Sequence, residues 1–263
     1  MKIELPYRPI RQKKTTDSLS DLYATMSQVV NFYQESLMMY SATRDSILPK
    51  SIPERSGRAY GYKNYTIPSI QIIERDDFHS EIYPVRLFHN TIVNIASSYE
   101  IYLRDLATEI YRYNTDLLKI DEKQLSTREV LEFENVDDIK AELIDRSVTN
   151  LIMSNYPDLV KRYESRFHIG IHGKRAALSL HETHHFLEVR NLIVHNDGHA
   201  SKLFFKRLKG YDKKSPLGIL DKHNSAELNF EYLNEFRDKL IALSEFIDAQ
   251  AMNKWETTEY ENK

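Results

Sequence analysis

The chain has 263 residues, of which 41% are hydrophobic and 29% charged, and its formal net charge is -3. These values are ordinary for a protein that buries a sizeable core as one domain or as a domain with additions. The absence of cysteine excludes disulfides and thiolate metal sites, and it fits a reducing cytoplasm.

The composition also predicts a helical protein without a membrane-spanning segment. Seven glycines in the whole chain are few for a sheet protein with many tight turns, so we predict an all-α fold. No run approaches the roughly 18 apolar residues of a membrane-spanning helix. The first residues lack the apolar segment of a secretory signal, so we expect a cytoplasmic protein without a membrane partner.

Apolar residues at helical spacing predict three long helices. The first covers about 18–40, with Ser18 or Ser20 as its N-cap. The longest covers about 80–118, and the last covers 226–255. We expect these helices to supply most of the core of a multi-helix bundle.

Shorter helices are predicted between the two longest ones. Ser126 and Glu129 have the spacing of a capping box, which starts a short helix. An amphipathic stretch follows at 136–152, and Pro157 suits the first position of the next helix.

Two segments interrupt this pattern. The segment 43–79 contains three prolines and two glycines, so we expect irregular structure or a small β insertion there, and irregular structure again at 199–224. The predicted organisation is an N-terminal arm, helix and irregular segment at 1–79, packed on a helical domain at 80–255. A tail at 256–263 completes one compact unit.

A further helix, predicted from Leu180 to Gly198, carries a polar stripe on a mostly apolar surface. At about 100° per residue, His184, Glu188 and His195 fall within a band of roughly 60°, together with Asn191. A helix that is apolar nearly all round is normally buried between others. Its buried polar groups then require partners or a function.

One interpretation of this helix is a metal site. Residues 181–185 match H-E-x-x-H, in which His181 and His185 would bind a metal and Glu182 would activate water. Glu188 and Asn191 stand where the extended metzincin pattern has glycine and histidine, so the third ligand is missing. We keep a metal-binding hydrolase as an alternative because the H-E-x-x-H pattern is present, although the third ligand is missing.

A second interpretation is RNA cleavage by Arg190 and His195. Metal-free cleavage needs a base for the 2′-hydroxyl, an acid for the leaving 5′-oxygen and a cation for the phosphorane. Histidine titrates in the right range for both proton transfers, and arginine binds phosphate oxygens as a fork. The two residues stand five positions apart, which is about 140° around an ideal helix.

Residues 190–195, RNLIVH, resemble the R-N-x3-H signature of the HEPN superfamily of endoribonucleases, which occur in bacterial toxins and antiviral systems. Upstream, 97–106 (SSYEIYLRDL) is similar to the acidic helix that several HEPN families place opposite this motif. The order of helices is also similar over roughly 80–250. The resemblance implies an all-α bundle of HEPN type.

The resemblance also implies roles for individual residues. Arg190 would hold the scissile phosphate and His195 would act as base or acid, giving 2′,3′-cyclic phosphate ends without a cofactor. Asn191 would orient His195, and Glu100 would position Arg190. HEPN enzymes usually join two such motifs across a homodimer, and an antitoxin or sensor protein is a possible partner. Asp197 stands where some HEPN toxins carry a modified tyrosine, so that form of regulation is not implied.

Two further alternatives stay open. A basic run after the central helix is either an RNA-binding surface or a solvated face; its candidate residues are Lys202, Lys206, Arg207 and Lys209. The domain could also be a non-catalytic nucleotide-binding, RNA-binding or scaffold module of HEPN type. In that case Arg190 would pair with Glu100, and His195 would be a cation near a helix C-terminus.

Overall fold

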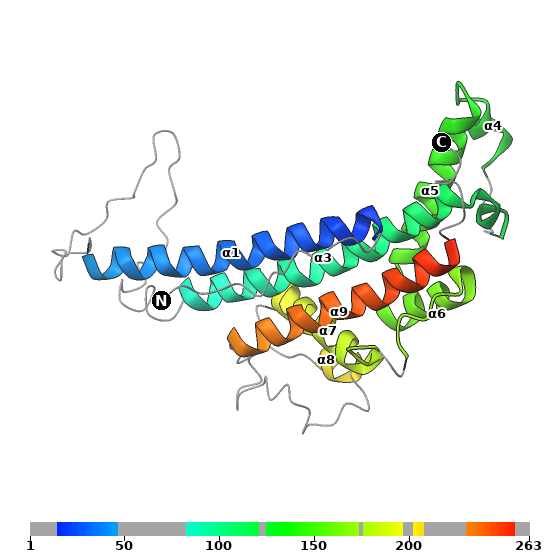
Figure 1. The fold of residues 1–263 in the computed structure, drawn as a ribbon. Coiled ribbons are helices and arrows are strands. Elements are labelled where there is room, and N and C mark those ends of the chain that lie inside the picture. The colour runs from blue at the N-terminus through cyan, green and yellow to red at the C-terminus, as the bar shows by residue number, and fades with distance from the viewer. Residues whose placement is uncertain are drawn as a thin grey trace, which may run out of the picture. The chain divides into compact units, whose positions relative to one another are not determined.

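A computed structural model describes residues 15–46, 83–120, 125–173, 176–196, 202–207 and 230–255 (Figure 1). Every regular element in these ranges is helical, which confirms the all-α prediction. The elements are α1 (Asp17–Ser46), α3 (Tyr83–Tyr113), the 3-10 helix η2 (Thr115–Ile120), α4 (Thr127–Val130), α5 (Val136–Ile152), α6 (Tyr156–Phe167), α7 (Leu180–Asn196), α8 (Lys202–Arg207) and α9 (Phe230–Trp255).

The chain divides into two compact units, and each is described by itself. The first contains the described residues up to Ala24, Ser97–Leu187 and those from Glu235 onward; the second contains Thr25–Ala96 and Glu188–Asn234 where described. The division falls within α1, α3, α7 and α9. In the parts of the chain that are described, no helix is long and apolar enough to cross a membrane.

The core of the first unit is built around the second half of α3. Buried apolar residues recur there at helical spacing, as predicted, and α6 and α9 add large buried side chains. The Tyr102 hydroxyl donates to the Ser244 carbonyl of α9 at 2.9 Å, and the Tyr163 hydroxyl of α6 donates to the Leu103 carbonyl. Fully burying each large apolar side chain contributes about 1.5–3 kcal/mol. Aromatic packing with satisfied hydroxyls therefore holds α3, α6 and α9 together.

The start of α1 differs from the prediction, because its N-cap is Thr16 and not Ser18 or Ser20. The Thr16 hydroxyl oxygen accepts from the N–H of the third helical residue at 3.2 Å, and Thr16 also donates to the buried carboxylate of Asp248 on α9. Ser18 is buried, and its backbone N–H donates to Glu109 of α3 at 2.7 Å. Tertiary partners thus decide where this helix begins.

The end of α3 also differs. The helix stops at Tyr113 and not near residue 118, and the chain continues as η2. The Asn114 side-chain oxygen accepts the N–H of Asp116 at 3.1 Å, a local bond that competes with continued α-helix. The predicted start near residue 80 lies outside the described residues. So does most of the 43–79 segment, of which 43–46 belong to α1.

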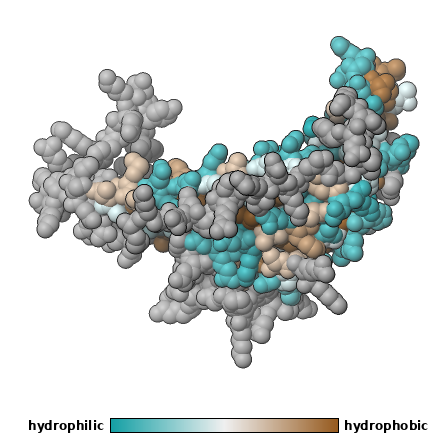
Figure 2. All heavy atoms as spheres, viewed as in Figure 1, coloured by the Kyte–Doolittle hydropathy of each residue, from teal (hydrophilic) through white to brown (hydrophobic). Residues whose placement is uncertain are grey.

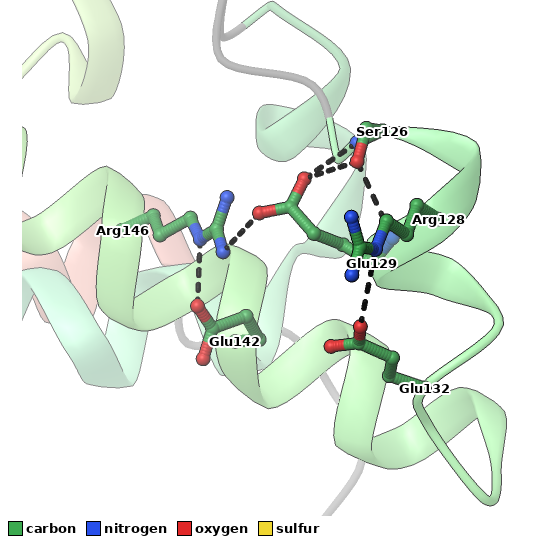
Figure 3. A network of polar contacts seen from close by, with 6 residues as sticks. All are labelled: Ser126, Arg128, Glu129, Glu132, Glu142 and Arg146. Carbon is green, nitrogen blue, oxygen red and sulfur yellow. Dashed lines mark hydrogen bonds and ion pairs between the residues drawn. The ribbon is translucent and has the colours of Figure 1, made fainter.

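Helix α4 is joined to α5 by the polar network of Figure 3. The predicted capping box of Ser126 and Glu129 is present. Arg146 donates to Glu129 at 2.8 Å and to Glu142 at 2.6 Å. Hydrogen bonds from Ser126, with Arg146, lower the pKa of Glu129 to about 2. Figure 2 shows hydrophobic residues, in brown, among hydrophilic ones, in teal, where Figure 1 labels α4. Leu131, which follows α4, is 80% exposed.

The next two helices begin at asparagine N-caps. Asn135 caps α5, whose bounds match the predicted 136–152, and Asn155 caps α6. Because α6 begins at Tyr156, Pro157 occupies its second position and not the first. At the other end His168 has a φ of 54°, a left-handed conformation that stops the helix.

A chain of hydrogen bonds joins α3, α6 and the loop before α7. His172 Nδ1 lies 2.9 Å from the Leu178 carbonyl, which can only accept, so Nδ1 carries the proton of the neutral ring. Its Nε2 therefore accepts from the Tyr156 hydroxyl at 2.8 Å, and Tyr156 accepts from Tyr99 at 2.9 Å. Burial lowers the pKa of His172, which favours this neutral form.

The second unit is held mainly by apolar packing. Tyr33 of α1 and Phe88 of α3 meet edge to face with ring centroids 6.0 Å apart, and Tyr40 stacks on Tyr83 at 4.6 Å. Its other buried apolar side chains, among the described residues, are Met26, Val30, Leu87, Ile92, Ile95, Ala96, Val189, Leu192, Phe204 and Leu233.

Candidate functional site

The first turn of α7 is fixed by a capping box that includes the glutamate of H-E-x-x-H. The backbone N–H and hydroxyl of Ser179 donate to Glu182 Oε2 at 2.9 and 2.7 Å, and the Glu182 N–H donates to Ser179 Oγ at 3.2 Å. The pattern S-x-x-E was readable in the sequence and was missed. Glu182 thus has a structural role at the start of α7.

The two histidines of that motif differ in exposure. His181 is exposed, whereas His185 is only 6% exposed. Burial, with the neighbouring His184 and His181, lowers the pKa of His185 to about 4. Among the residues placed by the structure, no three metal-ligating side chains form a cluster.

Protein stability is expected to fall as the pH falls from about 6.5 to about 4. In this window the unfolded chain protonates His185 and the folded chain does not, so about 3 kcal/mol present above pH 6.5 is lost. Urea unfolding at neutral and acidic pH measures this loss. His185→Gln should show a shallower pH dependence, and an unchanged dependence in that variant would show that the histidine is not the group responsible.

The second half of α7 changes from buried to exposed along its length. Glu188, Val189 and Leu192 are buried, whereas Val194 is 51% exposed and His195 is exposed. The prediction that the helix is buried nearly all round is therefore wrong for its last turn. His195 is thus exposed to solvent at the end of α7, while Glu188 is buried within the second unit.

Glu188 is the centre of a polar network. Its Oε1 accepts from Asn191 Nδ2 at 3.2 Å, and its Oε2 accepts from Arg207 Nη1 of α8 at 3.2 Å. Asn191 Oδ1 in turn accepts from Arg190 Nη1 at 3.0 Å. Burying the carboxylate of Glu188, a residue that is only 7% exposed, would cost free energy without such partners.

This network also contacts the guanidinium group of Arg190. The side chain is half-buried, and burial lowers its pKa, although a guanidinium stays protonated in proteins. Asn191 holds one guanidinium nitrogen, and Glu188 holds Asn191. The described contacts of Asn191 thus orient Arg190; its predicted role toward His195 stays a prediction.

The other predicted site residues fall in three places. Glu100 is half-buried on α3 in the first unit, so its pairing with Arg190 also stays a prediction. Lys202 and Lys206 are exposed on α8, where Arg207 pairs with Glu188. Lys209 lies outside the described residues.

The Glu188–Arg207 ion pair was not predicted, because no local sequence pattern links residues 19 positions apart.

Comparison of the chain with protein-family models, with curated proteins and with solved structures gave no match.

Proposed function

We propose that the chain is a metal-independent endoribonuclease of HEPN type that uses Arg190 and His195. One observation carries the proposal: a guanidinium is held by the Asn191–Glu188 network on the same helix as an exposed histidine. Such an enzyme would act in the cytoplasm as a toxin or an antiviral effector, with an antitoxin or sensor protein as a possible controlling partner.

The chemistry assigned to these groups is a transesterification. A neutral imidazole removes the proton of the 2′-hydroxyl, and the 2′-oxygen attacks phosphorus. The bond to the 5′-oxygen breaks, and a protonated imidazole supplies its proton. The guanidinium binds the oxygens whose negative charge grows in the transition state, and its orientation by Asn191 is fixed beforehand. The product is a 2′,3′-cyclic phosphate.

A single-stranded RNA oligonucleotide and its 2′-O-methyl counterpart test this proposal. The purified chain should cut the first and leave the second intact, because the methyl group removes the nucleophile. Equal cleavage of both would contradict 2′-hydroxyl attack. RNA binding without cleavage would favour the non-catalytic module of the same type.

The chain is expected to act as a homodimer in which the Arg190–His195 region lies at or near the interface. Cleavage needs a base and an acid at the same time, and each chain has one histidine in the motif. Exposed Val194, beside His195, offers an apolar contact for a partner. Val194→Asp should therefore lower both the dimer fraction in light scattering and the cleavage rate. A wild-type monomer at micromolar concentration with full activity would contradict this assembly.

RNA affinity should depend on salt through Lys202 and Lys206. Each phosphate contact with single-stranded nucleic acid contributes about 0.7 to the slope of log affinity against log salt. Replacing both lysines with alanine should therefore reduce the slope by about 1.4. Arg207 is left in place because it neutralises Glu188. Lys119→Ala with Lys161→Ala, two exposed lysines of the first unit, is the matched control. Equal slopes in the two double variants would show that α8 carries only a solvated charge.

A further inference from the structure

Helix α8 presents an aromatic ring at the protein surface. Phe205 is 46% exposed, whereas the preceding Phe204 is buried at 6%. The two rings meet edge to face, with centroids 5.6 Å apart and an interplanar angle of 80°. The buried ring therefore supports the exposed one in a preferred aromatic geometry. Phe205 is left partly exposed in the described structure, so its supported ring is available to a ligand.

Two lysines of the same helix lie to one side of this ring. At about 100° per residue, Lys202 lies about 60° from Phe205, and Lys206 lies about 40° beyond Lys202. Both lysines are exposed. Phe204 lies about 100° from Phe205, on the buried side of the helix. The exposed face thus combines one flat apolar group with two neighbouring positive charges.

We infer that Phe205 stacks on one unpaired base of a single-stranded RNA whose phosphates lie against Lys202 and Lys206. The inference rests on the RNA binding in the proposed function, and it specifies that the bound RNA is single-stranded. Positive charge selects an anionic polymer, and an aromatic ring binds the face of a base. In a duplex those faces are covered by neighbouring base pairs, so the ring selects single strands.

The ion pair of Arg207 connects this surface to the proposed catalytic residues. Arg207 of α8 donates to Glu188 of α7, and the same carboxylate holds Asn191, which holds Arg190. All of these residues belong to the second unit. A base fixed on Phe205 therefore fixes the register of the strand relative to Arg190, which makes Phe205 a positioning residue.

Fluorescence anisotropy with a labelled, 2′-O-methyl oligouridylate of about 12 nucleotides tests the inference without cleavage. Phe205→Ala and Phe205→Leu should each weaken binding about tenfold, and Phe205→Trp should restore it, because only an aromatic ring stacks. Binding of a blunt RNA duplex should be unchanged in all three variants. Phe32→Ala, which removes a 66% exposed ring of α1, is the matched control and should bind as the wild type does.

Several results would overturn the inference. Wild-type affinity in Phe205→Leu would show an apolar contact without stacking. A changed oligomeric state in light scattering, with unchanged RNA affinity, would assign the ring to a protein interface. An absence of RNA binding would remove both this inference and the proposed function. Loss of binding in Phe205→Ala with rescue by Phe205→Trp, in a chain that never cleaves RNA, would support the inference and remove only the proposed catalysis.

Discussion

Replacing His195 or Arg190 with alanine is expected to slow cleavage of single-stranded RNA by at least about 100-fold, because each removes a proton-transfer or charge-stabilising group from the transition state. His195 is exposed on the last turn of α7, so its removal leaves no cavity. Arg190 is half-buried and oriented by Asn191, so its removal frees the Asn191 carbonyl for water. Rates of cleavage under single-turnover conditions, with circular dichroism of each variant, measure the effect and the integrity of the fold.

His181→Ala is the matched control for His195→Ala, because both histidines are exposed on α7 and only one belongs to R-N-x3-H. It should retain the wild-type rate. The opposite pattern, with loss of activity in His181→Ala and His185→Ala and none in His195→Ala, would support the metal-dependent alternative. If the Arg190→Ala variant has a lower melting temperature but an unchanged cleavage rate, Arg190 has a structural role and not a catalytic one.

Phe186→Ala is expected to lower the free energy of unfolding by about 3–5 kcal/mol, the usual cost of deleting a buried phenylalanine ring. Phe186 is 0% exposed and lies parallel to Phe236 of α9, with centroids 4.6 Å apart and an interplanar angle of 9°. The deletion removes this stack and leaves a cavity between α7 and α9. Urea unfolding at neutral pH gives the free energy.

Phe32→Ala is the control for this loss. The Phe32 ring is 66% exposed, and surface substitutions usually change the free energy of unfolding by less than about 0.5 kcal/mol. Equal effects of the two substitutions would contradict the assignment of Phe186 to the core.

The helices could be predicted from the sequence wherever apolar periodicity alone decides the structure. Leu106 and Ile110 of α3, like Leu240 and Leu243 of α9, stand at the helical spacing from which these two helices were predicted, and all four are buried. The bounds of α5 were also predicted, from an amphipathic stretch, and the structure adds a local start signal in Asn135 and the acidic first turn. These features depend on residues close together in the sequence.

Two helix ends were predicted at the wrong residue, because they depend on distant partners or on small polar side chains. Thr16 caps α1 while Asp248, 232 residues away, binds it, and no local pattern contains that contact. Asn114 ends α3 early through its own side chain, which competes with an amphipathic pattern that continues beyond it. Periodicity reports which face is buried, and it does not report where the backbone leaves the helix.

The sequence suggests the residues of the candidate site, but it does not suggest the contacts between them. Arg190 and Asn191 could be chosen from the motif, but the contact of Asn191 with Glu188 and that of Glu188 with Arg207 depend on how α7 and α8 pack. The exposure of His195 was missed because the whole helix was expected to be buried, whereas Val194 and His195 are exposed in its last turn. The polar residues at helical spacing indicated which helix carries the candidate site. The packing of that helix determines which of these polar residues are buried.

The most direct test of the catalytic proposal is the cleavage of a single-stranded RNA by the wild-type chain in EDTA, with analysis of the product ends. We predict an unchanged rate on chelation and products that end in 2′,3′-cyclic phosphate, because 2′-hydroxyl attack by this arrangement needs no metal. The same assay should show no product with His195→Ala. Activity that is lost on chelation and retained in His195→Ala would contradict the account.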